Sequence, residues 1–324
     1  MEEDWIQNLR RYFFSYRQKD LDVEAAIQLK KQHIPRSLYK YRSVNEYALS
    51  NLKEDSAWCT HATNFNDPYD SSLCFDFSSG YMDSLFLKSI EKQASGKGDN
   101  FFTEDNMNVL STSDDPLKAM IELAANHEGS SVTPDMVDKL YEVCKEVAEN
   151  NIIEMNERFN AAVKQGYKIC SFSQRMDSML MWSHYSANHT GFAIEYDFSE
   201  LPVTDIRSRC LWPVLYDDEL FDASGFFMEK SREGSFNNLF GIISAIHKAK
   251  DWSYEHEWRM IIPMSPSDPP MNYYMPVPKA VYLGSKISKE DEGIIVDIAR
   301  AKGIDVHRMR LSHNRFQMIP EIVD

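Results

Sequence analysis

The segment from Lys250 to Ile262 constrains the fold most, because it alternates aromatic rings with charged and polar side chains. An alternation with a period of two is typical of a half-buried β-strand. The rings of one face would anchor the strand in a core, so the other face could line a cleft. That polar face would carry two neighbouring carboxylates, Glu255 and Glu257. The alternative is an edge strand whose charges are merely solvated.

The composition predicts a globular protein with a substantial core. The chain has 324 residues, of which 43% are hydrophobic and 12% aromatic, enough for two average domains or one large domain with an insertion. Fifty acidic residues stand against 35 basic ones, and the net charge of -15 would repel a phosphate backbone. Non-specific binding of nucleic acid is therefore not expected.

The cysteines and the hydropathy bear on metal binding and location. The five cysteines are scattered without a Cys-x-x-Cys pair, so neither a disulfide framework nor a zinc cage is predicted. His184 and His189 lack a third ligand at a usual spacing, so no metal site is expected. The chain starts with acidic residues and has no segment long and apolar enough to cross a bilayer. We expect a cytoplasmic protein without a membrane partner.

The order of strand-like and helix-like segments predicts an α+β fold with a mixed central sheet and flanking helices. Residues 1–35 read as N-terminal helices and residues 36–324 as the α+β domain, with a helical insertion at about 76–166. A helix is expected from 238 to 250, leading into the strand of the opening segment. Neither a Gly-x-Gly-x-x-Gly nor a P-loop sequence occurs, so nucleotide-binding folds that need them are not supported.

Arg42 lies where a predicted strand, residues 38–43, meets a predicted helix. Ser43 stands three residues before Glu46, which is a capping-box spacing. A guanidinium beside a helix N-terminus is well placed to hold a phosphate in a bidentate grip. An ion pair is the alternative interpretation.

Two further segments carry candidate binding groups. The polar loop 62–70 contains Asn66 and Asp67 and could form the rim of a cleft, although turn formation alone explains its composition. The predicted strand 167–174 has Ser171 and Ser173 on one face, where hydroxyls can orient neighbouring carboxylates.

Several short motifs in order resemble a bacterial family of unknown function, domain family 2971. The resemblance covers about residues 36 to 285, and the family name implies no reaction. The motifs are Tyr39-Lys40-Tyr41-Arg42, Phe65-Asn66-Asp67-Pro68-Tyr69, Ser171-Phe172-Ser173, Met181-Trp182-Ser183-His184-Tyr185 with Gly191-Phe192, and Trp252 with Tyr254-Glu255-x-Glu257-Trp258-Arg259.

A second likeness is to ADP-ribosyltransferases of the arginine-serine-glutamate type, which carry these residues in the same order as Arg42, Ser171 and Glu255-x-Glu257. This resemblance implies NAD as substrate, with Arg42 gripping the pyrophosphate and Ser171 orienting the catalytic group. Glu257 would stabilise the oxocarbenium-like transition state, and Glu255 would assist the acceptor. The chain departs from the family's Ser-Thr-Ser with Ser-Phe-Ser. Further contacts to NAD are expected from Tyr41, Ser173, Asn66, Asp67, His184 and Tyr185.

The resemblance implies a small-molecule nucleotide as ligand and leaves the macromolecular acceptor open. Two other classes of function are compatible with the same residues. Asp67, Asp70, Glu255 and Glu257 could gather a divalent cation for nucleic-acid hydrolysis, because hard cations need clustered oxygen ligands. Alternatively, the cleft could bind a ligand without turnover, as in a sensor or interaction module.

Overall fold

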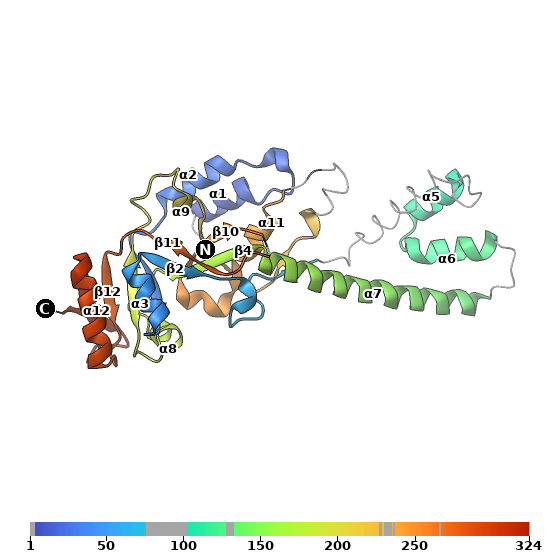
Figure 1. The fold of residues 1–324 in the computed structure, drawn as a ribbon. Helices are drawn as coiled ribbons and strands as arrows, with labels where there is room; N and C mark the ends of the chain where they lie inside the picture. Colours follow the sequence, from blue (N-terminus) through green and yellow to red (C-terminus); the bar gives the residue numbers. More distant parts are fainter. Residues whose placement is uncertain are drawn as a thin grey trace. The chain divides into compact units, whose positions relative to one another are not determined.

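The computed structural model describes residues 4–75, 103–127, 133–226, 229, 235, 237–265 and 267–323 (Figure 1). The chain divides into two compact units. The first comprises Met1–Ser72, Ala161–Phe221 and Asn237–Asp324, and the second comprises Leu73–Asn160 and Asp222–Phe236. Part of the helical insertion expected at 76–166, residues 76–102, lies outside the described residues.

The first unit is built on an eight-stranded sheet in the order β14-β13-β12-β5-β1-β4-β10-β6. Only β12 and β13 are parallel neighbours, and a helix connects them, so the sheet is mixed and the α+β prediction is confirmed. The strands are β1 (Leu38–Arg42), β4 (Tyr167–Ser173), β5 (Phe192–Tyr196), β6 (Leu211–Pro213), β10 (Glu257–Pro263), β12 (Ala280–Leu283), β13 (Asp305–Leu311) and β14 (Met318–Ile322).

The two faces of this sheet have different neighbours. On one face Leu38, Phe172 and Trp258 belong to the main hydrophobic core. On the other face Tyr39 and Tyr41 pack with a smaller aromatic cluster. Successive side chains of a strand point to opposite faces, so β1 contributes to both clusters.

Helices and short strands complete the first unit. Two pairs of short strands form, antiparallel β2 with β11 and parallel β7 with β9. The elements are α1 (Asp4–Phe13), η1 (Gln18–Asp20), α2 (Val23–Gln32), α3 (Glu46–Lys53), β2 (Ser56–Cys59), η2 (Ala62–Asn64), α8 (Met179–Tyr185), α9 (Ile206–Arg209), β7 (Leu215–Asp217), α11 (Phe240–Ile246), β9 (His247–Ala249), η3 (Lys250–Glu255), β11 (Met271–Tyr274) and α12 (Lys289–Lys302).

The second unit is mainly helical. Leu110 and Ala119 form a small core between α5 and α6. Its larger elements are α5 (Glu104–Thr112), α6 (Pro116–His127) and most of α7 (Pro134–Gln165), and the short strands β3 (Leu73–Cys74) and β8 (Phe221–Asp222) lie at its boundaries in the chain.

Three local predictions are wrong. The strand expected from 251 begins only at Glu257, because the preceding residues form the 3-10 helix η3 and His256 has a φ of 45°. Because His256 adopts this left-handed conformation, the alternation of side chains expected for a strand starts only at Glu257. The helix expected at 238–250 is also wrong at its end, because residues 247–249 form β9. The residue that caps α3 is Asn45, whose side chain accepts a hydrogen bond from the N–H of Ala48, and not Ser43.

Gly191, the residue before β5, packs closely against the backbone of β1. A Cβ atom at this position would lie 2.1 Å from the carbonyl oxygen of Arg42. We expect Gly191→Ala to lower the free energy of unfolding by about 1–3 kcal/mol, the usual cost of overpacking. Urea unfolding followed by circular dichroism measures the change.

Gly293→Ala is the matched control, because a Cβ atom there meets nothing within 4 Å. It lies inside α12, where alanine favours the helix by about 0.5–1 kcal/mol. Equal effects of the two substitutions would contradict the close approach of Gly191 to β1.

Candidate functional site

A pocket of about 190 Å³ opens on the sheet face that carries Tyr39 and Tyr41. Three neighbouring strands form its floor. Across β4, Ser173 is the register partner of both Tyr39 and Glu257, and Ser171 is the partner of Arg259. The period of two therefore brings these side chains to one face. Aromatic side chains from outside β10, including Phe65 and Tyr185, also line it.

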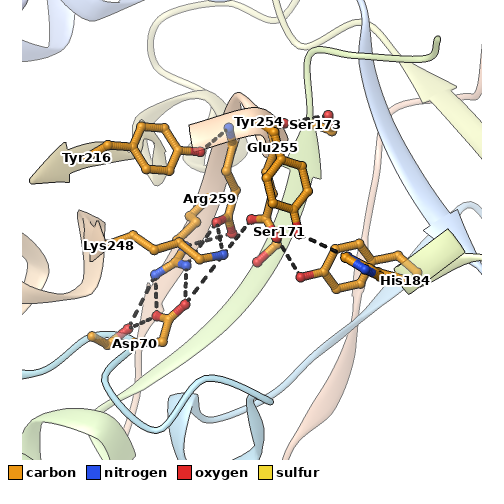
Figure 2. Close-up of polar contacts among 12 residues, drawn as sticks. Asp70, Ser171, Ser173, His184, Tyr216, Lys248, Tyr254, Glu255 and Arg259 are labelled. Carbon is orange, nitrogen blue, oxygen red and sulfur yellow. Dashed lines mark hydrogen bonds and ion pairs between the residues drawn. The ribbon is translucent and has the colours of Figure 1, made fainter. Parts of the chain in front are cut away.

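A buried ion-pair cluster lines this pocket, and Figure 2 shows its polar contacts. The guanidinium of Arg259 is fully buried and contacts Asp70 through two nitrogens, at 2.7 and 2.6 Å. It also contacts both carboxylate oxygens of Glu257, at 2.7 and 2.9 Å. Lys248 Nζ bridges Glu257 at 2.9 Å and Glu255 at 2.5 Å. The cluster thus holds three carboxylates and two cations.

The charges of this cluster keep Glu257 ionised. Burial alone would raise the pKa of Glu257, but the charges of Arg259 and Lys248 lower it well below its usual range. A hydrogen bond from Ser171 acts in the same direction. Glu257 therefore serves as a fixed negative charge that compensates two buried cations.

Glu255 titrates differently although it lies only two residues away. Burial and the neighbouring charge of Glu257 raise its pKa to about 7, against the opposing effect of Lys248. Its second oxygen accepts a hydrogen bond of 2.5 Å from the hydroxyl of Tyr185. Two carboxyls with pKa values pushed apart are the usual basis for dividing acid and base roles in a site.

Side-chain hydroxyls help to fix the backbone that separates the two glutamates, together with the hydrogen bond from the N–H of Gln174 to the carbonyl oxygen of His256 at 3.0 Å. The hydroxyl of Ser173 donates to the carbonyl oxygen of Glu255 at 2.6 Å. The hydroxyl of Tyr216 accepts from the N–H of Glu257 at 2.8 Å (Figure 2). These bonds hold the turn at His256, so that Glu255 reaches the same side of the sheet as Glu257.

The structure brings seven of the ten predicted site residues to the pocket. One of them, Asn66, is exposed at its edge. The other six lie on β1, β4, β10, η3 and α8. The seven residues are Glu257, Glu255, Ser171, Tyr41, Ser173, Asn66 and Tyr185.

Three predicted residues do not line this pocket. Arg42 follows Tyr41 on β1 and therefore points to the opposite face, where Nη2 donates to Asn51 at 3.4 Å. His184 is exposed and hydrogen-bonded to the hydroxyl of Tyr254 at 3.0 Å. Asp67 accepts the N–H of Tyr69 and borders a neighbouring hollow.

Two cations of the cluster were not assigned a site role from the sequence. Arg259 falls on the correct face by alternation, but its partner Asp70 is 189 residues away in the chain. Lys248 was expected inside a helix at 238–250, whereas the chain forms the strand β9 from residue 247. The signal that could have found both is charge balance, since two glutamates on one buried face need cations.

The carboxylates of the cluster do not form a metal site. Among the described residues, no group of three or more His, Cys, Asp and Glu side chains is arranged to hold a metal ion. The oxygens of Asp70, Glu255 and Glu257 are already hydrogen-bonded to Arg259, Lys248 and Tyr185. Three of the four carboxylates named for the cation-binding hypothesis are therefore already engaged by side chains of the protein.

Comparison with known proteins supports the first resemblance. Residues 181–260, from α8 to the middle of β10, match the model of a family described as a protein of unknown function, DUF2971. Searches among curated proteins and among solved structures found no match. In the part of the chain that the structure describes, no helix has the length and apolarity needed to span a membrane.

Arg259→Gln would leave Asp70 and Glu257 buried without their main cation. We expect it to lower the free energy of unfolding by about 3–5 kcal/mol, as for other broken buried pairs. The control is Arg158→Gln, which removes an exposed pair with Glu154 and should cost about 0.3–0.5 kcal/mol. Urea unfolding of the two variants measures the difference, and a loss at Arg259 as small as that at Arg158 would contradict the buried network.

The raised pKa of Glu255 also predicts how stability depends on pH. The folded state binds this proton more tightly than the unfolded chain, whose ordinary pKa is 4.5. The resulting stabilisation is complete below pH 4.5 and is lost as the pH rises through about 7.

As the pH rises from 4.5 to about 7, the free energy of unfolding of the wild-type protein should therefore fall relative to that of Glu255→Gln. Glu290→Gln, at an exposed residue on α12, keeps Glu255 and should therefore follow the wild-type curve. Parallel curves for all three proteins would argue against the shift.

Proposed function

We propose that the pocket is an active site in which Glu255 moves a proton during cleavage of an N-glycosidic bond, with NAD as the first substrate to test. The observation that carries this proposal is a carboxyl with a pKa of about 7 at the wall of an aromatic pocket, beside a second carboxyl that stays ionised. A group whose pKa lies near the working pH is best suited to general acid–base catalysis.

The chemistry of NAD cleavage matches a carboxylate base. The bond between the anomeric carbon of the ribose and the nicotinamide nitrogen breaks, and nicotinamide leaves as a neutral molecule with the bonding electron pair. The oxygen of water or of an acceptor attacks the same carbon and gives its proton to the Glu255 carboxylate. Ionised Glu255 also favours the positive charge that develops on the ribose.

The size and lining of the pocket indicate which part of the substrate enters. A volume of about 190 Å³ is below the range of about 300–1,000 Å³ typical of whole ligands, so one ring with its sugar would enter and the rest would lie outside. Phe65 and Tyr185 offer ring faces, and Asn66 offers an amide at the edge. Lys40 borders the pocket, but its Nζ donates to the carbonyl oxygen of Ser171 at 2.9 Å and lies over the ring of Phe172 on the opposite face, so we assign it no contact with the phosphate.

This proposal changes the roles implied by the resemblance to ADP-ribosyltransferases. Glu257 is hydrogen-bonded to Arg259 and Lys248, so we give it the role of positioning these cations, and Glu255 takes the proton. Ser171 positions Glu257, and Arg42 has no part in this pocket. A macromolecular acceptor stays open, with hydrolysis as the simplest outcome.

The expected cytoplasmic location belongs to the same proposal. Cys59, Cys144, Cys170 and Cys210 are free thiols, which fits a reducing compartment. NAD is available there as a small-molecule nucleotide.

A binding role without turnover is the second candidate. It is favoured by the fact that each oxygen of Asp70, Glu255 and Glu257 already has a hydrogen-bond partner. Such a satisfied network stabilises a fold without any catalytic role. Ligand contact without product release would support this candidate.

Release of nicotinamide from NAD by the purified protein tests the enzymatic proposal. We expect the rate to rise with pH through about 7, because Glu255 must be ionised to accept the proton. Glu255→Gln should lower the rate by about 100-fold or more, the usual contribution of a positioned base.

The control is Glu290→Gln, which changes an exposed glutamate of α12 and should keep the wild-type rate. Circular dichroism checks that each variant is folded. The absence of nicotinamide release by the wild-type protein, or an undiminished rate in folded Glu255→Gln, would refute the role of Glu255.

A further inference from the structure

A second hollow, of about 540 Å³, lies on the opposite face of β1 from the pocket of Glu255. It is formed within the first unit by the end of β1, the helix α3 and the strand pair β2–β11. Six residues line it: Arg42, Asn45, Tyr47, Asn51, Trp58 and Asn272. Its volume is within the range of about 300–1,000 Å³ that small-ligand sites occupy.

Arg42 supplies this hollow with an uncompensated positive charge. The guanidinium is partly buried, and burial lowers its pKa. Among the residues that the structure describes, it makes no ion pair, and no carboxylate lines the hollow. Its hydrogen bond to Asn51 Oδ1 is long, at 3.4 Å. A charge removed from water without a counter-ion is costly, so an anionic ligand would stabilise it.

Each of the three asparagines already uses its carbonyl oxygen as an acceptor within the protein. Asn51 Oδ1 accepts from Arg42, and its Nδ2 donates to Asn272 Oδ1 at 2.9 Å. Asn45 Oδ1 accepts from the N–H of Ala48 at 2.8 Å. Each of these oxygens therefore already accepts a hydrogen bond, while the side-chain amide groups of Asn45 and Asn272 donate none among the described residues. Together with Arg42 they suit a ligand rich in acceptor oxygens, such as a phosphate.

Two exposed aromatic rings border the same hollow. Trp58 is 44% exposed and Tyr47 is 81% exposed. Trp58 is the register partner of Asn272 in the pair β2–β11, so a ring and an amide donor lie side by side. Exposed rings of this kind offer a surface on which a planar base can stack.

We infer that this hollow binds a mononucleotide, with its phosphate at Arg42 and its base against Trp58 and Tyr47. The inference stands apart from the proposed function, because it uses no residue of the pocket around Glu255. Since Tyr41 lines that pocket and Arg42 follows it on β1, occupancy of the hollow would act on the strand that carries the pocket wall.

Isothermal titration of AMP into the full chain tests the inference. Wild-type protein should bind AMP, and Arg42→Gln should weaken binding by about tenfold or more, the effect of losing a hydrogen bond to a charged group. Arg42→Lys should lie between them, because it keeps the charge but loses the bidentate geometry. Adenosine and inorganic phosphate should each bind more weakly than AMP.

Asn272→Asp is a second variant that replaces the donor amide by a carboxylate while keeping the acceptor oxygen for Asn51. It should also weaken AMP binding, and it provides a second test if Arg42→Gln does not fold. Arg36→Gln, an exposed arginine before β1, should bind AMP like the wild type. Glu255→Gln should do the same, which separates this result from the test of the pocket.

Three outcomes would overturn the inference. One is the absence of AMP binding at millimolar concentration. Another is AMP binding that folded Arg42→Gln and Asn272→Asp both leave unchanged. The third is inorganic phosphate binding as tightly as AMP, which would leave an anion site without recognition of a base.

Discussion

The structure around the candidate site depends on the buried guanidinium of Arg259. A fully buried charge is tolerated only when its donors are matched, and here Asp70, Glu257 and the carbonyl oxygen of Ala245 accept all of them. These contacts join the loop before β3 and the end of α11 to β10. They also place Glu257 where it attracts Lys248, so the polar face of the sheet is organised around one side chain.

This arrangement gives two glutamates that are two residues apart different chemistry. Glu257 lies among cations and keeps its charge, whereas Glu255 shares only Lys248 with it and accepts a hydrogen bond from Tyr185. The left-handed turn at His256 makes the difference, because it lifts Glu255 out of the strand toward Tyr185. The alternation of side chains along β1 separates the second hollow from the pocket. Tyr41 and Arg42 are consecutive, so their side chains lie on opposite faces of the sheet.

Much of the fold could be predicted from local patterns, because a period of two determines which side chains share a face. It predicted β1 and β4 and the alternation of β10 from Glu257 onward, and it put Ser171 and Ser173 on one face. It failed where long-range contacts override local pattern. The 3-10 helix before Glu257 and the strand that carries Lys248 depend on hydrogen bonds and ion pairs between segments distant in sequence. Sequence spacing also cannot show that Arg42 and Glu257 lie on different faces.

A carboxyl-carbon NMR titration of glutamate-labelled protein tests the central claim most directly. Glu255→Gln and Glu257→Gln would assign the two resonances. We expect Glu255 to titrate with a midpoint of about 7, while Glu257 stays ionised to the lowest pH at which the protein is folded. A midpoint for Glu255 near the ordinary value of 4.5 would contradict the division of roles between the two glutamates.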